Sequence, residues 1–172
     1  MIYVHVNTKM MIMKKIIVSG TGHRPNKLGG YSTHSFTKLV NIAKEWLIEN
    51  KTEYVISGMA LGWDMALAQA SIECDIPLLC AIPFKGQELK WSDEQQLQYK
   101  KILRCAFKIV VVCDGEYHPK KMQIRNEWMV DNSNTILAMW DGSAGGTYNC
   151  INYANKKRNK NIINLYEKWK TI

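Results

Sequence analysis

The sequence predicts an α/β fold in which a doubly wound, mainly parallel sheet forms a single domain. Short apolar runs alternate along the chain with segments whose apolar residues recur every three or four positions, and this alternation is typical of strands joined by crossover helices. The run at residues 76–82 is almost wholly apolar, as expected for a strand covered on both faces. Glycine-bearing loops follow three of the runs. In a parallel sheet, such loops would all lie at one edge.

The first half of the chain contains two predicted strands, each followed by a helix. Gly20 ends the first apolar run, and the stretch after Pro25 is rich in Gly and Pro, which indicates a loop. Apolar residues between positions 36 and 47 fall on one helical face. The predicted elements are a strand at 15–19, a loop at 25–33, a helix at 35–50 that Ser35 opens, a strand at 54–56 and a helix at 65–73.

The second half repeats this pattern. Pro77 lies near the start of its apolar run, where a strand tolerates proline. Ser92 and Gln95 have the spacing of a capping box, which indicates the start of a helix. The predicted elements are strands at 76–82, 107–113, 135–140 and 161–165, and helices at 92–106, 120–131 and 147–158.

The composition is that of a globular protein with a sizeable core. The 172 residues suffice for one domain and are too few for two ordinary ones. Hydrophobic residues make up 47% of the chain and charged residues 22%, which argues against disorder. The apolar runs are far shorter than the roughly 20 residues that a membrane-spanning helix needs, so we expect no such helix.

The first residues of the chain do not resemble a secretory signal, because they lack a continuous apolar centre and a small-residue cleavage site. We therefore expect a cytoplasmic location. Met10, Met11 and Met13 are alternative starts, and Met13 lies just before the first strand. Residues 1–12 are accordingly predicted to be an N-terminal extension, and residues 13–172 the domain.

Cysteine content and charge narrow the chemistry. Five cysteines are scattered without a C-x-x-C pair, which predicts reduced thiols rather than disulfides or a zinc site. Neither a metal nor a cofactor is predicted. The formal net charge of +8 favours an anionic partner, which is a nucleotide, a nucleic acid or merely counter-ions. Part of the excess lies in a lysine-rich C-terminal stretch, for which a solvated helix face is the simpler interpretation.

The stretch from Ser57 to Asp64 is the first candidate for a binding site. An apolar run ends there at Ser57-Gly58, and a helical segment follows Gly62, so free backbone N–H groups at the helix start would offer an anion site. Asp64 would lie in the first helical turn, where it either stabilises the helix dipole or accepts hydrogen bonds from ribose hydroxyls. Trp63 either stacks on a base or packs in the core.

The loop after the first strand is the second candidate. Gly20-x-Gly22 lacks the third glycine of the dinucleotide fingerprint, since residue 25 is proline, and no P-loop pattern is present. His23 and Arg24 would place an imidazole and a guanidinium beside free N–H groups, which suits a phosphate or a base edge. The alternative for His23 is a loop histidine that is bonded to backbone.

Together these motifs resemble the SLOG superfamily of Rossmann-like domains, and most closely its YpsA-like family. The resemblance rests on Ser57-Gly58-x-Ala60-x-Gly62-x-Asp64, on Gly20-x-Gly22-His23-Arg24-Pro25 before it, and on Gly145-Gly146-Thr147 after it. It implies a domain that binds a nucleotide or a nucleotide-derived molecule at the C-terminal edge of the sheet, as a sensor or by sequestration, and it does not by itself imply catalysis. Related folds commonly dimerise, so the resemblance also suggests a homo-oligomer, although the sequence leaves the oligomeric state open.

The same resemblance suggests two other functions. LOG phosphoribohydrolases of the superfamily cleave nucleoside monophosphates with an M-x-x-R-K segment and a P-G-G-x-G-T-x-x-E segment. Here Met122 and Arg125 match the first segment but Asn126 replaces its lysine, and Cys150 stands where the second has its glutamate. A thiol is a poor substitute for that carboxylate, and Glu127 would replace it only if its helix is suitably rotated. Binding without catalysis is therefore favoured, and no catalytic residue is predicted.

The DNA-processing protein A family shares the motif of residues 57–64 and binds single-stranded DNA. The net positive charge fits this function, but the tryptophans do not alternate with basic residues along one surface. Trp46, Trp128 and Trp140 are predicted to pack in the core. Nucleic-acid binding is therefore the less favoured alternative, and no membrane partner is expected.

Arg125 is the charged residue most strongly implicated in binding. Its helix would bring it over the sheet edge at which the glycine loops lie, where a guanidinium can hold a phosphate with two hydrogen bonds. The alternative is a surface ion pair with Asp131 or Glu127. The complete predicted ligand site consists of Gly20, Gly22, His23, Arg24, Ser57, Gly58, Gly62, Asp64, Arg125, Asn126, Gly145, Gly146 and Thr147.

Overall fold

A six-stranded parallel sheet forms the centre of the molecule. The computed structural model describes residues 15–157 and 160–171, and in it the strands have the order β4-β3-β2-β1-β5-β6. Every neighbouring pair is parallel, which confirms the predicted fold class. The strands are β1 (Ile17–Gly22), β2 (Tyr54–Ser57), β3 (Leu78–Ile82), β4 (Lys108–Val111), β5 (Thr135–Met139) and β6 (Asn161–Asn164).

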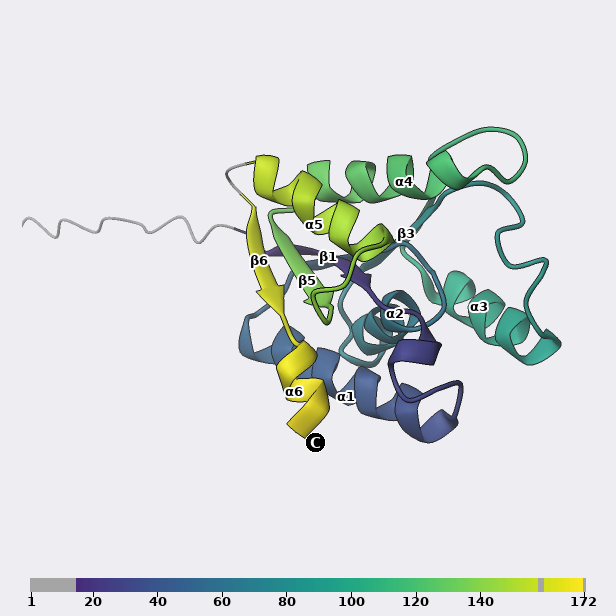
Figure 1. Ribbon diagram of the computed structural model, residues 1–172. Coiled ribbons are helices and arrows are strands. Elements are labelled where there is room, and N and C mark those ends of the chain that lie inside the picture. The colour runs from purple at the N-terminus through teal and green to yellow at the C-terminus, as the bar shows by residue number, and fades with distance from the viewer. Residues whose placement is uncertain (1–14, 158–159, 172) are drawn as a thin grey trace, which may run out of the picture.

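Helices cover both faces of this sheet (Figure 1). Helices α4 and α5 pack on one face, and α1, α2 and α6 lie on the other, with α3 beside α2. The helices are α1 (Thr33–Glu49), α2 (Trp63–Glu73), α3 (Asp93–Cys105), α4 (Pro119–Asp131), α5 (Gly146–Lys156) and α6 (Tyr166–Thr171), and a short 3-10 helix, η1, spans Pro25–Lys27. Among the described residues, no helix is long and apolar enough to cross a membrane.

The direction of winding reverses between β1 and β5. The chain builds the sheet outward from β1 to β4 and then returns to place β5 on the opposite side of β1, with Gly22 beside Met139 at the C-terminal ends of the two strands. The segments that follow β1 and β5 therefore leave in opposite directions, and a crevice opens between them. Ligands of open α/β sheets bind at this kind of position.

Helix α2 is the most deeply buried helix and sets the close packing of this region. Trp63, Leu67, Ala66 and Ala70 are fully buried, and most other residues of the helix are buried as well, as expected for one that is enclosed on several sides. The first two lie against β1 so closely that a Cβ on Gly20 would be 2.7 Å from Leu67 Cδ2. The small residues of α2 allow this approach.

Two element boundaries differ from the prediction in ways that affect the site. β1 continues through Gly22 rather than ending before Gly20, because the missing side chains of both glycines make room for α2. Helix α1 starts at Thr33, where the Ser32 hydroxyl accepts a hydrogen bond from the backbone N–H of Ser35. Ser32, not Ser35, is thus the N-cap.

Other elements also differ from the prediction. Helix α2 begins at Trp63 rather than residue 65, and β4 is a short edge strand whose Ile109 is 46% exposed. Helix α6 was not predicted. The predicted extension at 1–12 and the predicted helix end at Arg158 lie outside the described residues.

Candidate functional site

A cavity of about 310 Å³ opens at the C-terminal edge of the sheet, where the winding reverses. Its walls come from the segment after β1, the loop before α2, helix α4 and the segment that leads into α5. The lining residues are Thr21, Gly22, His23, Arg24, Asn26, Lys27, Ala60, Asp64, Met122, Arg125, Asn126, Ser143, Ala144, Gly145, Gly146 and Thr147.

The start of α5 forms one wall of this cavity. Gly145 is the N-cap, with φ of 145° and no side-chain cap, so the first N–H groups of the helix have no capping side chain. A Cβ on Gly145 or Gly146 would meet no atom within 4 Å. The glycines therefore leave the helix N-terminus open to the cavity, and such an end attracts anions through its N–H groups and its dipole.

The start of α2 is different, because the segment after β1 covers it. The Trp63 N–H donates to the His23 carbonyl at 3.3 Å, and a Cβ on Gly62 would lie 2.5 Å from the same oxygen. The Ser57 hydroxyl donates to the Asp64 carbonyl at 2.7 Å. Ser57, Gly58 and Gly62 do not line the cavity, and they serve the local packing of α2.

Arg125 and Asp64 form a buried pair in the floor of the cavity. Arg125 Nη1 lies 3.8 Å from Asp64 Oδ2, and the side chains are only 4% and 8% exposed. Nη1 also donates to the Gly58 carbonyl, and Nε donates to Asn126 Oδ1 at 2.9 Å. Gly58 must be glycine, because a Cβ would overlap the guanidinium and lie 2.7 Å from Asp64 Oδ2.

The buried pair contradicts the alternative expectation for Arg125, which was a surface ion pair with Asp131 or Glu127. Asp131 interacts with Lys157 and Tyr153, and Glu127 accepts a hydrogen bond from Gln123, so neither carboxylate binds Arg125. Burial raises the pKa of Asp64, and the Arg125 and Arg24 guanidiniums oppose part of that rise. Burial likewise lowers the pKa of Arg125, against the attraction of Asp64.

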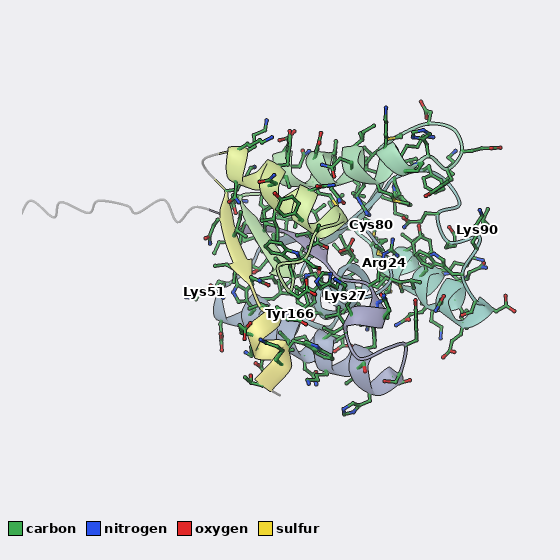
Figure 2. All side chains as sticks on the ribbon, in the orientation of Figure 1. Arg24, Lys27, Lys51, Cys80, Lys90 and Tyr166 are labelled. Carbon is green, nitrogen blue, oxygen red and sulfur yellow. The ribbon has the colours of Figure 1, made fainter. Side chains whose placement is uncertain are left out.

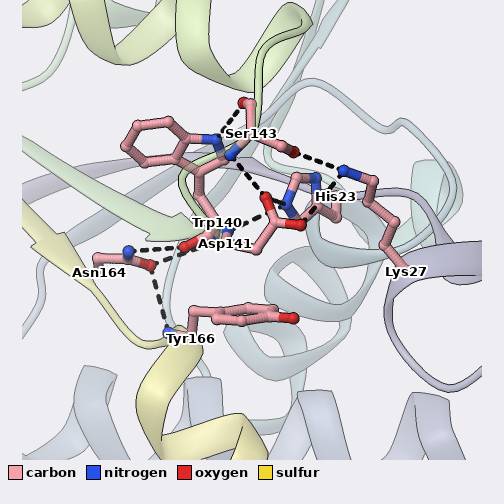
Figure 3. Close-up of polar contacts among 7 residues, drawn as sticks. All are labelled: His23, Lys27, Trp140, Asp141, Ser143, Asn164 and Tyr166. Carbon is pink, nitrogen blue, oxygen red and sulfur yellow. Dashed lines mark hydrogen bonds and ion pairs between the residues drawn. The ribbon is translucent and has the colours of Figure 1, made fainter.

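His23 belongs to a polar network that holds the segment after β5 (Figure 3). Its Nε2 lies 3.0 Å from the backbone N of Asp141 and 2.7 Å from Asp141 Oδ1. Lys27 Nζ reaches Asp141 Oδ2 at 3.2 Å and also bonds to the Ser143 hydroxyl. The Ser143 hydroxyl and N–H, with His23 and Lys27, hold the pKa of Asp141 well below its usual range. The network thereby fixes the loop that leads to Gly145.

The cavity carries a net positive charge. Arg24 and Lys27, both labelled in Figure 2, line it together with Arg125, and Asp64 is the one carboxylate among its described lining residues. Arg24 and Lys27 are exposed, so a ligand can reach both cationic groups, although Lys27 Nζ already pairs with Asp141 and the Arg125 guanidinium is engaged with buried protein atoms.

The tryptophans take structural positions. Trp63 is fully buried, and its Nε1–H donates to the Leu137 carbonyl at 2.9 Å, which excludes stacking on a base. Trp46 and Trp128 pack against buried clusters, as predicted. Trp140 is only partly buried and donates to the Ser143 carbonyl at 2.8 Å, so it supports the loop rather than the core.

Comparison with known proteins identifies the family. Residues 18–167 match the family model YpsA, which is described as the YspA SLOG family. The chain belongs to the YpsA SLOG family. The predicted resemblance is thus confirmed.

Two curated relatives extend this comparison. The chain is 37% identical over 139 residues to the uncharacterized SPbeta prophage-derived protein YoqJ of Bacillus subtilis (strain 168), which covers 69% of this chain and 79% of that one. It is 24% identical over 153 residues to a UPF0398 protein of Bacillus thuringiensis (strain Al Hakam), with 83% of each chain covered.

Solved structures share the fold of this SLOG family member at low sequence identity. DNA processing protein A (DprA) from Streptococcus pneumoniae superposes with a TM-score of 0.60 at 16% identity, over 87% of this chain and 50% of that one. DprA from Helicobacter pylori, whose structure concerns single-stranded DNA binding, gives 0.62 at 16% identity, over 87% and 64%. The chain thus spans half to two thirds of these DprA chains. The molybdenum cofactor carrier protein of Chlamydomonas reinhardtii gives 0.56 at 14% identity, over 92% and 82%.

The two positions at which the chain departs from the hydrolase motif lie in different surroundings. Asn126 lines the cavity. Cys150 is 3% exposed and packs with Val130 and Ile136, and burial raises its thiol pKa to about 11. Glu127 is not among the described lining residues.

Seven residues that line the cavity are absent from the predicted ligand site, and the contacts of Asp141 in the loop were not predicted either. These lining residues are Thr21, Asn26, Lys27, Ala60, Met122, Ser143 and Ala144. The D-G-S pattern at 141–143 is a signal for the loop, because Asp141 Oδ1 accepts a hydrogen bond from the Ser143 N–H. No local pattern signals that Lys27 reaches this loop.

Proposed function

We propose that this SLOG family member binds a nucleotide or a nucleotide-derived small molecule in the cavity between β1 and β5, with a phosphate against the N-terminus of α5. The observation that carries the proposal is the uncapped start of α5, where Gly145 and Gly146 leave room on the cavity side. A phosphate there would accept hydrogen bonds from the first N–H groups of the helix.

The surrounding charges support the same ligand class. Arg24 and Lys27 are exposed cations that line the same cavity, and Lys27 is held against Asp141 and Ser143 of the loop before α5. Asp64 would repel a phosphate but can accept hydrogen bonds from ribose hydroxyls. Arg125 contributes positive potential and holds Asp64 in place, rather than binding the phosphate with two hydrogen bonds from its guanidinium.

Binding without hydrolysis is the favoured activity, because Cys150 is buried outside the cavity at the position where the hydrolase motif has its glutamate. The protein would then act by sensing or sequestering its ligand. A cytoplasmic location and a homo-oligomeric state remain part of this proposal.

Calorimetric titration with the four ribonucleoside 5′-monophosphates tests the proposal. The matching nucleosides and inorganic phosphate test the nucleoside and the phosphate of the ligand separately. At least one monophosphate should bind the wild type. Gly146→Val adds a side chain at a position with no atom within 4 Å, so it should reduce affinity at least ten-fold while leaving the melting temperature nearly unchanged. Asn149→Val, which alters an exposed residue of the same helix outside the cavity, is the matched control.

Unchanged affinity in folded Gly146→Val would refute the assigned phosphate position. Release of free base during the titration would favour the phosphoribohydrolase alternative. Preferential, strongly salt-dependent binding of a thymidine oligonucleotide over every monophosphate would favour the single-stranded DNA alternative.

A further inference from the structure

A second cavity, of about 390 Å³, lies between the start of α1, the first turns of α2 and helix α3. It is larger than the cavity at the start of α5, and the predicted phosphate site does not include it. Both volumes lie near the lower end of the range for small-molecule sites, roughly 300 to 1,000 Å³.

The two cavities are separated by the thickness of a single backbone segment. Adjacent residues of the chain line one cavity and then the other at three places: Arg24 and Pro25, Ala60 and Leu61, and Asp64 and Met65. The first turn of α2 and the segment after β1 therefore form their common wall. The two cavities are therefore neighbours along this wall.

The lining of the second cavity has a different chemistry from the first. Phe36, Leu39, Leu61 and Met65 supply an apolar floor, and Gln98 with other polar side chains supplies hydrogen-bonding groups. The two charged residues of its lining have opposite signs, Glu94 and Lys101, so its net charge is zero. Such a lining suits a flat, uncharged heteroaromatic ring with polar edges, and it lacks the net positive charge of the first cavity.

We propose that the second cavity receives the base of the nucleotide whose phosphate lies at the start of α5, across the wall formed by Arg24 and Pro25. The inference rests on the proposed function, and it adds that two cavities of different chemistry recognise two different parts of the ligand. The cationic cavity binds the phosphate, and the apolar cavity distinguishes the base. A ligand without a base would lose the second contribution.

The experiment compares each ribonucleoside 5′-monophosphate with ribose 5-phosphate, which lacks a base. The tightest monophosphate should bind the wild type roughly ten-fold or more tightly than ribose 5-phosphate. Gln98→Trp fills the second cavity from α3, and it should reduce the affinity for the monophosphate to that for ribose 5-phosphate, without changing the latter. Thr33→Trp fills the same cavity from α1 and serves if Gln98→Trp fails to fold.

Lys100→Trp is the matched control, because it adds the same side chain to an exposed position of α3 that does not line the cavity. Its affinities should equal those of the wild type. The inference is overturned if both cavity-filling variants fold and bind the monophosphate as the wild type does, or if they weaken ribose 5-phosphate equally. The proposed function fails separately if Gly146→Val leaves every phosphate-bearing probe unaffected, and failure of all of these probes to bind the wild type would refute both.

Discussion

Removal of the Arg125 guanidinium should destabilise the fold itself, even without a ligand. Arg125 and Asp64 are 4% and 8% exposed, and loss of one partner of a buried ion pair costs about 3–5 kcal/mol. For a chain of this length, each kcal/mol lowers the melting temperature by about 2–4 °C. Arg125→Met should therefore melt roughly 6–20 °C below the wild type, as measured by circular dichroism.

A double-mutant cycle separates the pair from general loss of packing. Arg125→Met leaves the Asp64 carboxylate buried without its partner, whereas Arg125→Met with Asp64→Asn leaves no uncompensated charge, so the double variant should lose less than the sum of the single variants. Lys120→Met alters an exposed residue of α4 and should change stability by no more than about 0.5 kcal/mol. Additive single effects, or a melting temperature for Arg125→Met within 2 °C of the wild type, would refute the reasoning.

Three further predictions concern glycines, thiols and acid stability. Gly58→Ala should cost about 1–3 kcal/mol in denaturant titration, because its Cβ overlaps the buried ion pair, whereas Gly146→Ala should be neutral or slightly stabilising. Iodoacetamide at pH 8 should alkylate the exposed Cys105 in the native protein and spare Cys150, whose pKa burial raises to about 11; equal labelling by mass spectrometry would contradict this. The pKa of Asp141 is lowered in the fold, so the stability that Asp141→Asn removes should be present in full above about pH 4 and should shrink as the pH falls below it. A constant difference in melting temperature between the wild type and Asp141→Asn from pH 6 to pH 3 would contradict this.

The fold could be predicted because its signals are local. Continuous apolar runs, helical spacing and the Ser92 capping box each depend on a few neighbouring residues. The difference at the end of β1 has a physical cause. Gly20 and Gly22 were expected to end β1, but they serve as spaces for Leu67 and Trp63, and this packing depends on residues more than 40 positions away.

The candidate site could be predicted only in part for the same reason. The motifs placed Gly145, Gly146 and Thr147 at a helix start at the sheet edge, and the structure has them there. The motifs did not distinguish an open helix start from a covered one: Gly58 packs against Arg125 and Gly62 against His23 at the covered start of α2, and Gly62 also lines the second cavity. Lys27 was missed because its partners, Asp141 and Ser143, are more than 110 residues away.

The most direct test of the proposed phosphate position is an NMR titration of ¹⁵N-labelled protein with the tightest-binding ribonucleoside monophosphate and with inorganic phosphate. The account predicts that both probes shift the amide resonances of Gly145, Gly146 and Thr147 most strongly, with saturation at a single affinity for each probe. The amide of Trp63, which already donates to His23, should respond weakly. Strong shifts at the start of α2 with none at the start of α5, or shifts spread over the exposed lysines alone, would contradict the account.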